Sequence, residues 1–361
     1  MGDNDTIEVL TTLPNRYASF KETVVETDLP EKLSIIRFNI PEHKSGMLDQ
    51  ALSYMTYYVH ARRYVRKKDY DIVFATSSRL LTAYLGAIIA KKKAIPFVVD
   101  IRDIFTDTLN SILNNWFAKL LIIVFRIIEK KTVSRATRIN LVSIGFKDYF
   151  KRIRADVPYS FITNGIDSEF LEYNFAKTEI TDKIIITYAG NIGKGQGLEK
   201  IIPEFAQALG DNYLFRIIGD GGMRYALEQK LRELQIENVQ IIDPVKRDKL
   251  LLYYKESDYL FLHLNNYKAF NKVLPSKIFE YAAAGKPVIA GVSGYAETFI
   301  KTNLNSGWLV FAPSELSDLI TKFKEFEPVI ESKIIFCEKY ARTKLMSKFA
   351  EIIIDTYSNI L

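Results

Sequence analysis

The chain has 361 residues, 48% of them hydrophobic and 25% charged, so it holds enough apolar material for two globular domains of ordinary size. A single cysteine, Cys337, excludes a disulfide framework and a cysteine-rich metal site, and it fits a reducing cytoplasm. The three histidines are not spaced as a metal-binding pair, and no uncharged apolar run reaches the ~18 residues that cross a bilayer.

The charge is distributed unevenly along the chain. Residues 1–165 hold 25 Lys and Arg against 17 Asp and Glu, a net charge of +8, whereas the remainder holds 24 against 26. Such an excess suggests an anionic partner for the first half, either lipid headgroups or nucleic acid, with an ordinary solvated surface as the alternative. We do not expect nucleic acid, because aromatic residues do not alternate with the basic ones on a strand face.

The first half alternates short apolar runs with helical patterns, which predicts a parallel sheet covered by helices on both faces. The predicted strands are residues 7–12, 33–39, 72–75, 96–100, 139–143 and 159–163. The predicted helices are residues 47–68, 80–92 and 112–131. Within the last of these, WFAKLLIIVFRII (116–128) fits either a buried crossover helix or an interfacial helix lying on anionic lipid.

The second half repeats this pattern. Its predicted strands are residues 184–189, 213–218, 239–242, 259–264 and 288–290. Its predicted helices are residues 198–209, 223–234, 247–254, one helix from Ser314, and a helical tail over 331–359. Because apolar periodicity lapses over 167–183, we predict two Rossmann-like domains, residues 1–172 and 173–340, that face each other across a cleft. We expect a C-terminal helix of about 341–361 to pack back on the first domain.

Two glycine clusters of the second half, AGNIGKGQGLE and GDGGMR, each follow a predicted strand. A strand, a glycine-rich turn and a helix N-terminus form an anion site, because backbone N–H groups converge there and the helix dipole favours phosphate. Neither cluster is a dinucleotide fingerprint or a P-loop, since position 198 is Leu and no GK[ST] occurs. Both lie at carboxyl ends of strands in one predicted sheet, the edge where such sheets bind ligands.

The stretch PSKIFEYAAAGKPVIAG reads as turn, short helix, stop and strand. Ser276 is in the N-cap position, Gly285 in the C-cap position, and Pro287 prevents the helix from continuing. Glu280 lies one residue beyond the position that a capping box requires. It fits either an i,i+3 ion pair with Lys277 on a solvated face, or a carboxylate at a cleft that accepts two ribose hydroxyls.

Taken together, these segments resemble glycosyltransferase family 4, of the GT-B fold. The motifs that carry the resemblance are AGNIGKGQGLEKII, RIIGDGGMRYALE, YKESDYLFLHL and PSKIFEYAAAGKPVIAG, which cover most of residues 184–312. The first half is similar more loosely, through FVVDIRDIF and ITNGID. The last motif is most similar to the branch that builds O-antigen, capsule or exopolysaccharide units, including N-acetyl amino-sugar transferases.

The resemblance implies a retaining transferase with a nucleotide-sugar donor, expected to be UDP-linked, and with no metal ion or other cofactor. Without a metal, N–H groups and cations must stabilise the diphosphate leaving group. By position in the motifs, the predicted donor-binding residues are Gly190, Asn191, Gly193, Lys194, Gly219, Asp220, Gly221, Arg224, Ser276 and Glu280. Glu280 would bind the donor ribose, and Lys194 or Lys277 would neutralise the diphosphate.

The acceptor side depends on Asp103, just after the predicted strand that ends at Asp100. Family members often have a histidine or an acidic group near this position. We expect Asp103 to orient or deprotonate the acceptor hydroxyl, with strand-end turn chemistry as the alternative. The predicted catalytic residues are therefore Asp103 and Lys277.

Three features depart from the family pattern. Lys272 stands where a second glutamate is common, and Asn191 and Gln196 replace the usual Arg and Lys of the first glycine loop. In addition, residues 7–12 resemble the second strand of the family's first domain, and no glycine lies between Gly2 and Gly46. We therefore expect the opening β–α unit of that domain to be missing.

The leading hypothesis is a cytoplasmic glycosyltransferase, peripheral on the inner face of the cell membrane, in bacterial surface polysaccharide synthesis. Its expected partners are a nucleotide sugar, a polyprenyl-diphosphate-linked saccharide and an anionic membrane surface. The alternatives are a catalytically impaired GT-B scaffold or subunit, and a nucleotide-sugar epimerase of the same fold, which the scarcity of histidine disfavours.

Overall fold

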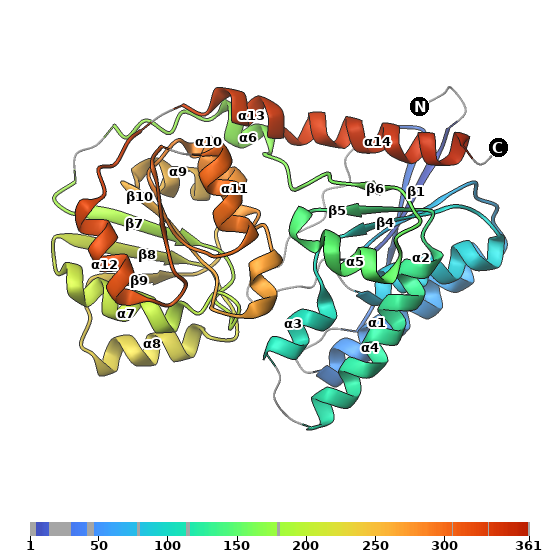
Figure 1. Ribbon diagram of the computed structural model, residues 1–361, viewed down its shortest axis with the longest axis horizontal. Helices are drawn as coiled ribbons and strands as arrows, with labels where there is room; N and C mark the ends of the chain where they lie inside the picture. The colour runs from blue at the N-terminus through green and yellow to red at the C-terminus, as the bar shows by residue number, and fades with distance from the viewer. Residues whose placement is uncertain are drawn as a thin grey trace.

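The computed structural model describes residues 5–13, 30–41, 47–77, 80–112, 116–178, 181–304, 306–330 and 332–359. Within these ranges the strands form three parallel sheets (Figure 1). The orders are β1-β2, β3-β4-β5-β6 and β12-β11-β10-β7-β8-β9. The alternation of strands and helices predicted from the sequence thus gives the expected parallel pairing.

The N-terminal part contains the first two of these sheets. Its strands are β1 (Ile7–Thr12), β2 (Leu33–Phe38), β3 (Val73–Thr76), β4 (Phe97–Ile101), β5 (Arg138–Leu141) and β6 (Tyr159–Ser160). Its helices are α1 (Met47–Val65), α2 (Leu80–Lys93), α3 (Phe105–Ile112), α4 (Trp116–Arg135) and α5 (Lys147–Ile153), with the short turn η1 (Ile144–Phe146) before α5.

Strand β4 of this part is buried along its whole length, including Asp100. Successive side chains of a strand point to opposite faces of the sheet. Phe97 and Val99 are buried in a core shared with α2, α4 and α5, whereas Val98 packs with Phe349 of α14 (Arg342–Ser358) on the other face. Helices cover both faces, so each position along β4 is buried.

The C-terminal part is built on the six-stranded sheet. Its strands are β7 (Ile184–Ala189), β8 (Tyr213–Ile218), β9 (Val239–Ile242), β10 (Tyr259–His263), β11 (Val288–Gly291) and β12 (Trp308–Phe311). Its helices are α6 (Ser168–Glu172), α7 (Leu198–Leu209), α8 (Arg224–Glu233), α9 (Arg247–Glu256), α10 (Lys277–Ala284), α11 (Tyr295–Asn303), α12 (Leu316–Glu325) and α13 (Ile334–Tyr340), with the short turn η2 (Lys268–Lys272).

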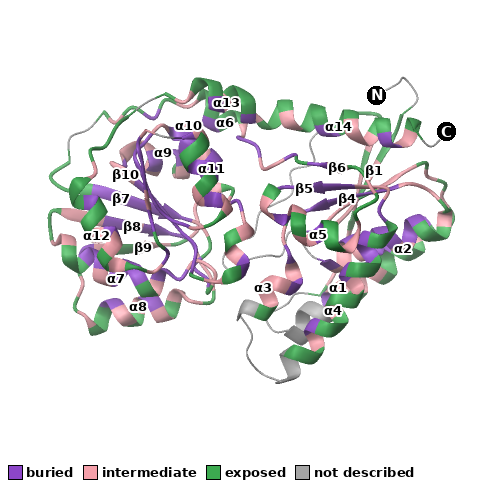
Figure 2. Ribbon diagram, in the orientation of Figure 1, coloured by how far each residue is buried: buried purple, intermediate pink, exposed green. Residues whose placement is uncertain are grey.

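Its sheet is buried on both faces, as the purple strands of Figure 2 show. Leu260 and Leu262 of β10 pack in one core with α9, α10 and α11. Phe261, between them, packs in the other core with α7, α8 and α12. The central strand β10 is therefore covered on both faces of the sheet.

The chain passes between the two parts twice, and the two passages lie side by side. Ile166 forms a parallel bridge with Ala341. The N–H of Ile166 donates to the carbonyl of Tyr340 at 2.8 Å, and the N–H of Arg342 donates to the carbonyl of Ile166 at 2.8 Å. Ala341 is extended, with φ −55° and ψ 129°, so the tail is two helices, α13 and α14. The predicted helical tail over residues 331–359 is therefore interrupted at Ala341, where tertiary pairing overrides local propensity, and α14 corresponds to the C-terminal helix predicted at about 341–361.

After this break, α14 runs along the N-terminal part (Figure 1). The ring of Phe349 meets the ring of Phe74 edge to face, with centroids 5.4 Å apart. The guanidinium of Arg138 donates to the hydroxyl of Thr356 at 2.8 Å. The C-terminal helix is therefore attached to the N-terminal part by both apolar and polar contacts.

The region before β5 also differs from the prediction. A single helix was predicted at residues 112–131, but the structure has α3 ending at Ile112 and α4 extending from Trp116 to Arg135. The α3 sequence, FTDTLNSI, has its three apolar residues at helical spacing, but it is only eight residues long and five of them are polar, so its signal is weak. Its first residue, Phe105, packs edge to face on Phe125 of α4 with centroids 5.1 Å apart.

The N-terminal strands form two separate ladders. Within the described residues, β1 pairs only with β2, and β3 pairs only with β4. Helix α1 packs across both, because the same core contains Leu10 of β1, Phe38 of β2, Tyr57 of α1 and Val73 of β3. No helix in the described part of the chain is both long and apolar enough to cross a membrane.

Candidate functional site

The two glycine loops that follow β7 and β8 pack directly against each other. The N–H of Gly190 donates to the carbonyl of Ile218 at 2.9 Å, and the N–H of Ile192 donates to the carbonyl of Asp220 at 2.9 Å. A Cβ atom on Gly219, whose φ is +144°, would lie 1.8 Å from the carbonyl oxygen of Gly190. Only glycine fits there, and the two loops form one continuous surface at the strand ends.

Helix α10 places Lys277 and Glu280 at the same edge. A Cβ atom on Gly190 would lie 3.7 Å from Cε of Lys277, so the lysine stem packs against the first glycine loop. Nζ of Lys277 donates to Oε2 of Glu280 at 2.7 Å, and the two side chains are 23% and 16% exposed. The i,i+3 ion pair predicted as one interpretation therefore exists, and it lies half-buried beside the glycine loop.

The ends of α10 agree with the sequence in part. Gly285 is left-handed, with φ +64°, and ends the helix as predicted. Ser276 occupies the N-cap position, but its backbone is helical, with φ −61°, and its side chain makes no capping hydrogen bond. Ser276 therefore adjoins Lys277 at the edge of the site, and its predicted capping bond is absent from the structure.

Arg247, the first residue of α9, was missed in the sequence analysis. Its guanidinium lies 3.9 Å from Oε1 of Glu280 and 3.3 Å from Oδ2 of Asp167. It also lies 5.0 Å from the ring centroid of Phe170, within cation–π range. The Glu280 carboxylate thus faces one cation on each oxygen.

The first glycine loop is held by amide side chains. Nδ2 of Asn191 donates to Oε1 of Gln196 at 2.9 Å, and a Cβ atom on Gly193 would lie 2.4 Å from that same Nδ2. The carbonyl of Lys194 accepts a hydrogen bond from Nδ2 of Asn265 at 2.9 Å, while the Lys194 side chain is exposed. Asn191, Gly193 and Lys194 therefore lie on one loop, with the Lys194 ammonium reaching outward.

The second glycine loop leads into α8. The N–H of Gly221 donates to Oδ1 of Asp220 at 2.7 Å. Nε of Arg224 donates to Oε1 of Glu228 at 2.9 Å, and its guanidinium also pairs with Asp243. Since Arg224 is committed to two carboxylates, it stabilises the start of α8, and its charge is largely compensated.

The buried His263 forms a hydrogen bond with the first glycine loop. The N–H of Ser314 donates to Nε2 of His263 at 3.0 Å, so Nδ1 carries the ring proton and donates to the carbonyl of Gln196. Burial lowers the pKa of His263 to about 4, so the ring is neutral at physiological pH. The sequence analysis gave His263 no role, because its two partners lie 67 and 51 residues away.

Asp103 lies just before α3, in the N-terminal part. Oγ1 of Thr108 donates to its Oδ1 at 3.2 Å. Burial raises the pKa of the Asp103 carboxyl above its usual range, and the charge of Asp107 raises it further. Its side chain lines a cavity of about 10 Å³ together with Glu129 and Ser77. The structure thus places Asp103 toward the N-terminal core and does not bring it into contact with the glycine loops.

Lys272, the residue that departs from the family pattern, connects the two parts. Its ammonium forms an ion pair with Asp107 of α3, and its carbonyl accepts a hydrogen bond from Oγ of Ser143 at 2.6 Å. The backbones are also close, because a Cβ atom on Gly145 would lie 2.4 Å from the Lys272 carbonyl oxygen. This lysine therefore faces the N-terminal part at the η2 turn.

The site brings together paired glycine loops at the strand ends and cations held by a carboxylate. Among the described residues, no group of three or more His, Cys, Asp or Glu side chains converges as a metal site requires. Residues 170–339 match the family model of glycosyl transferases group 1. This part of the chain is a glycosyltransferase domain. It contains both glycine loops, Lys277 and Glu280.

Two curated relatives are similar in sequence to parts of this chain. Over 116 residues it is 32% identical to the putative colanic acid biosynthesis glycosyl transferase WcaI of Escherichia coli (strain K12), covering 32% of this chain and 28% of the relative. Over 286 residues it is 22% identical to 2-deoxystreptamine N-acetyl-D-glucosaminyltransferase of Niallia circulans, covering 74% of this chain and 71% of the relative. The first alignment thus spans about a quarter of its relative's length.

The fold is similar to that of HepE from Anabaena, solved with UDP and glucose. The TM-score is 0.65 at 17% identity, and the match covers 89% of this chain and 86% of HepE. The α/β, GT-B fold predicted from the sequence is confirmed by this similarity. Within this chain, the matched residues 170–339 contain the whole six-stranded sheet, β7 to β12.

Proposed function

We propose that this chain is a retaining glycosyltransferase that moves a sugar from a UDP-linked donor to a lipid-linked saccharide of a bacterial surface polysaccharide. The observation that carries the proposal is the contact between the Gly190 loop and the Lys277–Glu280 pair. Relatives named for colanic acid synthesis and for N-acetylglucosaminyl transfer support a sugar transfer of this class.

The diphosphate would lie over the two glycine loops. As the bond between the anomeric carbon and the β-phosphate oxygen breaks, negative charge grows on the diphosphate. Lys277 is the first residue of α10, so its ammonium and the positive end of the helix dipole act on the same point. Together with the loop N–H groups, they stabilise the leaving group in place of a metal ion.

Glu280 would bind the two hydroxyls of the donor ribose. A carboxylate accepts two hydrogen bonds side by side, and Lys277 and Arg247 orient its two oxygens at 2.7 and 3.9 Å. The crystal structure of HepE, which contains UDP, supports uridine as the nucleoside of the donor.

Asp103 is the proposed acceptor-side carboxylate. A new bond forms between the acceptor oxygen and the anomeric carbon, and the proton of the acceptor hydroxyl passes to a base. The raised pKa of Asp103 makes it a stronger base than an exposed aspartate. It precedes α3, the helix that meets η2 of the glycosyltransferase domain through Asp107 and Lys272.

A lipid-linked acceptor would be reached at the membrane surface. Helix α4 connects β4 to β5 and buries Ile122, yet Leu120, Ile123, Val124 and Ile127 are 60%, 55%, 49% and 50% exposed. Their spacing places them on one face of the helix. The same helix also carries four exposed cations, Lys119, Arg126, Lys130 and Lys131. We propose that it lies on the anionic inner face of the cell membrane.

The test uses UDP binding and turnover. Glu280→Ala should abolish the thermal shift that UDP produces, whereas Glu297→Ala, which breaks the exposed Glu297–Lys301 pair, should keep it. Turnover of a UDP-sugar onto a polyprenyl-diphosphate saccharide should survive EDTA. Equal UDP shifts in both variants would contradict the proposed donor site.

A non-catalytic GT-B subunit is the second candidate. It is favoured by the N-terminal strands, which form two separate ladders within the described residues. Such a subunit would still bind UDP through Glu280 but would not turn over a sugar donor. The turnover assay therefore separates the two candidates.

A further inference from the structure

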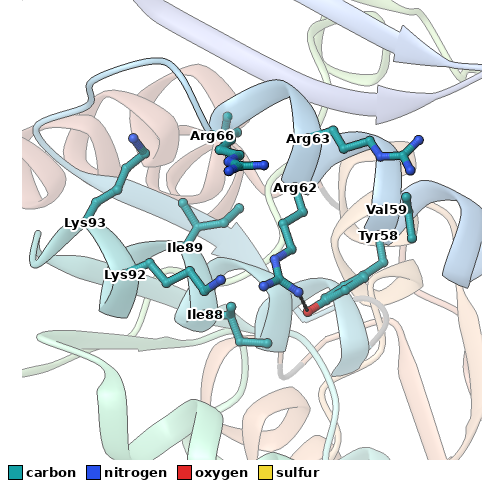
Figure 3. A pocket seen from close by; sticks show the side chains of 10 residues that line it. Tyr58, Val59, Arg62, Arg63, Arg66, Ile88, Ile89, Lys92 and Lys93 are labelled. Atoms are coloured by element: carbon teal, nitrogen blue, oxygen red, sulfur yellow. Dashed lines mark hydrogen bonds between the residues drawn. The ribbon is translucent and has the colours of Figure 1, made fainter.

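A basic pocket lies between the C-terminal ends of α1 and α2, on the N-terminal part of the molecule. Its volume is about 620 Å³, within the usual range of ligand pockets. Figure 3 shows cations from both helices, with Arg62, Arg66 and Lys92 nearest the middle of the pocket and Arg63 extending away from the lysines. These cations are Arg62, Arg63 and Arg66 of the α1 end, and Lys92 and Lys93 of the α2 end.

The pocket has no acidic lining residue. In the part of the chain that the structure describes, none of its five cations is paired with a carboxylate. Arg62 donates to the hydroxyl of Tyr58 at 3.3 Å, and Lys93 donates to the carbonyl of Lys68. The acidic side chain on the adjoining strand, Glu8, is bonded to Lys68 instead. Among the described residues, the cations that line the pocket are therefore free of close ion pairs.

The floor of the pocket is apolar. Val65 and Ile89 are only 6% and 9% exposed, and Ile88 and Tyr58 form walls above them. An apolar floor lowers the local dielectric constant and strengthens the attraction of the cations for an anion. The negative ends of two helix dipoles favour single cations there, by about 0.3–1 kcal/mol each, but they do not account for five cations around one hollow.

We propose that this pocket binds phosphate groups, supplied either by a phospholipid headgroup or by a soluble polyphosphate. The proposal stands apart from the glycosyltransferase activity, because the pocket shares no residue with the glycine loops or with α10. The lipid source is a reasonable one to test, because α2 packs against α4, whose outer face is apolar. A membrane that contacts α4 would therefore adjoin the same group of helices that carries the pocket.

The experiment measures the reactivity of a lysine in the pocket, so phosphate that binds at the glycine loops does not affect the result. Acetylation of Lys92, which lines the pocket, is compared by mass spectrometry with acetylation of Lys91, an exposed neighbour outside it. The chain is titrated with inorganic pyrophosphate and, separately, with phosphatidylcholine vesicles with and without phosphatidylglycerol. Both lysines are on α2, so a change in reagent or in overall lysine reactivity affects them alike.

Two variants of equal charge provide the control. Arg66→Gln removes a cation that lines the pocket, and Lys67→Gln removes its exposed neighbour outside it. We expect pyrophosphate or anionic vesicles to protect Lys92 but not Lys91. We expect Arg66→Gln to raise the half-protecting concentration about tenfold, as for the loss of a charge-assisted hydrogen bond, with Lys67→Gln close to wild type.

Each outcome decides the proposal. Protection by pyrophosphate alone assigns a soluble anion, and protection by phosphatidylglycerol vesicles alone assigns a headgroup. Equal protection of Lys91 and Lys92, equal effects of the two variants, or no protection by either probe would overturn the proposal.

Discussion

Lys277 and Glu280 form an ion pair, with Nζ 2.7 Å from Oε2, at the place where α10 meets the first glycine loop. Each side chain orients the other, and in the proposed complex each contacts a different part of the donor. The ammonium acts on the diphosphate, and the carboxylate acts on the ribose. Substitutions of the two residues should therefore have different ligand dependence.

Lys277→Met should weaken UDP binding about tenfold or more and leave uridine binding nearly unchanged, because it removes a charge-assisted contact to phosphate. Calorimetric titrations with UDP and with uridine measure both. Lys301→Met, which breaks an exposed i,i+4 pair with Glu297, serves as the control. Equal losses for the two ligands would show that Lys277 acts only by holding the ribose carboxylate.

Gly219→Ala should separate the two glycine loops. The new Cβ atom would be 1.8 Å from the carbonyl oxygen of Gly190, at a φ of +144°, so the backbone must move. We expect a loss of about 2–4 kcal/mol in the free energy of unfolding, measured by urea titration, and loss of UDP binding. Gly222→Ala meets no atom within 4 Å and should cost much less. Similar losses for both variants would contradict the close packing of the loops.

The sequence predicts the glycosyltransferase domain well because its signals are local. Each strand, each glycine turn and the short helix that Gly285 ends is specified by residues that are close together in the sequence. Hydrophobic alternation and turn chemistry report such features directly. The ion pair of Lys277 with Glu280 is also local, three residues apart.

Contacts between distant segments could not be predicted in this way. Arg247 reaches Glu280 from another helix, and no periodicity links the two. The break at Ala341 depends on its bridge to Ile166, 175 positions earlier in the chain. Helix α3 has a mostly polar sequence and depends on contacts with α4 and η2. Each is a tertiary effect that overrides or supplements local preference.

His263 should make stability depend on pH between about 4 and 6.5. Its pKa is about 4 when folded and 6.5 when exposed, so the unfolded chain binds more protons in this window. Its contribution to stability is complete above pH 6.5 and is lost as the pH falls toward 4, by about 3 kcal/mol. Urea titrations across this range measure the effect.

His263→Gln is the matched variant, because a glutamine amide can accept from the Ser314 N–H and donate to the Gln196 carbonyl. The stability difference between wild type and His263→Gln should shrink or reverse as the pH falls. Comparison of the two removes the opposite contributions of Asp103 and Glu129, whose pKa values burial raises. A constant difference from pH 7 to pH 4 would show that His263 does not titrate in this window.

Lys272 should stabilise α3 against local unfolding through its ion pair with Asp107. Because α3 has few apolar residues of its own, we expect Lys272→Gln to speed amide hydrogen exchange in residues 105–112 several-fold, as expected for a lost ion pair of about 1 kcal/mol. Asp107→Asn should have a similar effect, and the double variant should add little to either single one, since both remove the same contact. Lys322→Gln breaks the Lys322–Asp318 pair on α12 and should leave α3 unchanged. If exchange in α3 is the same with and without Lys272, the contact across the two parts is not what keeps this helix folded.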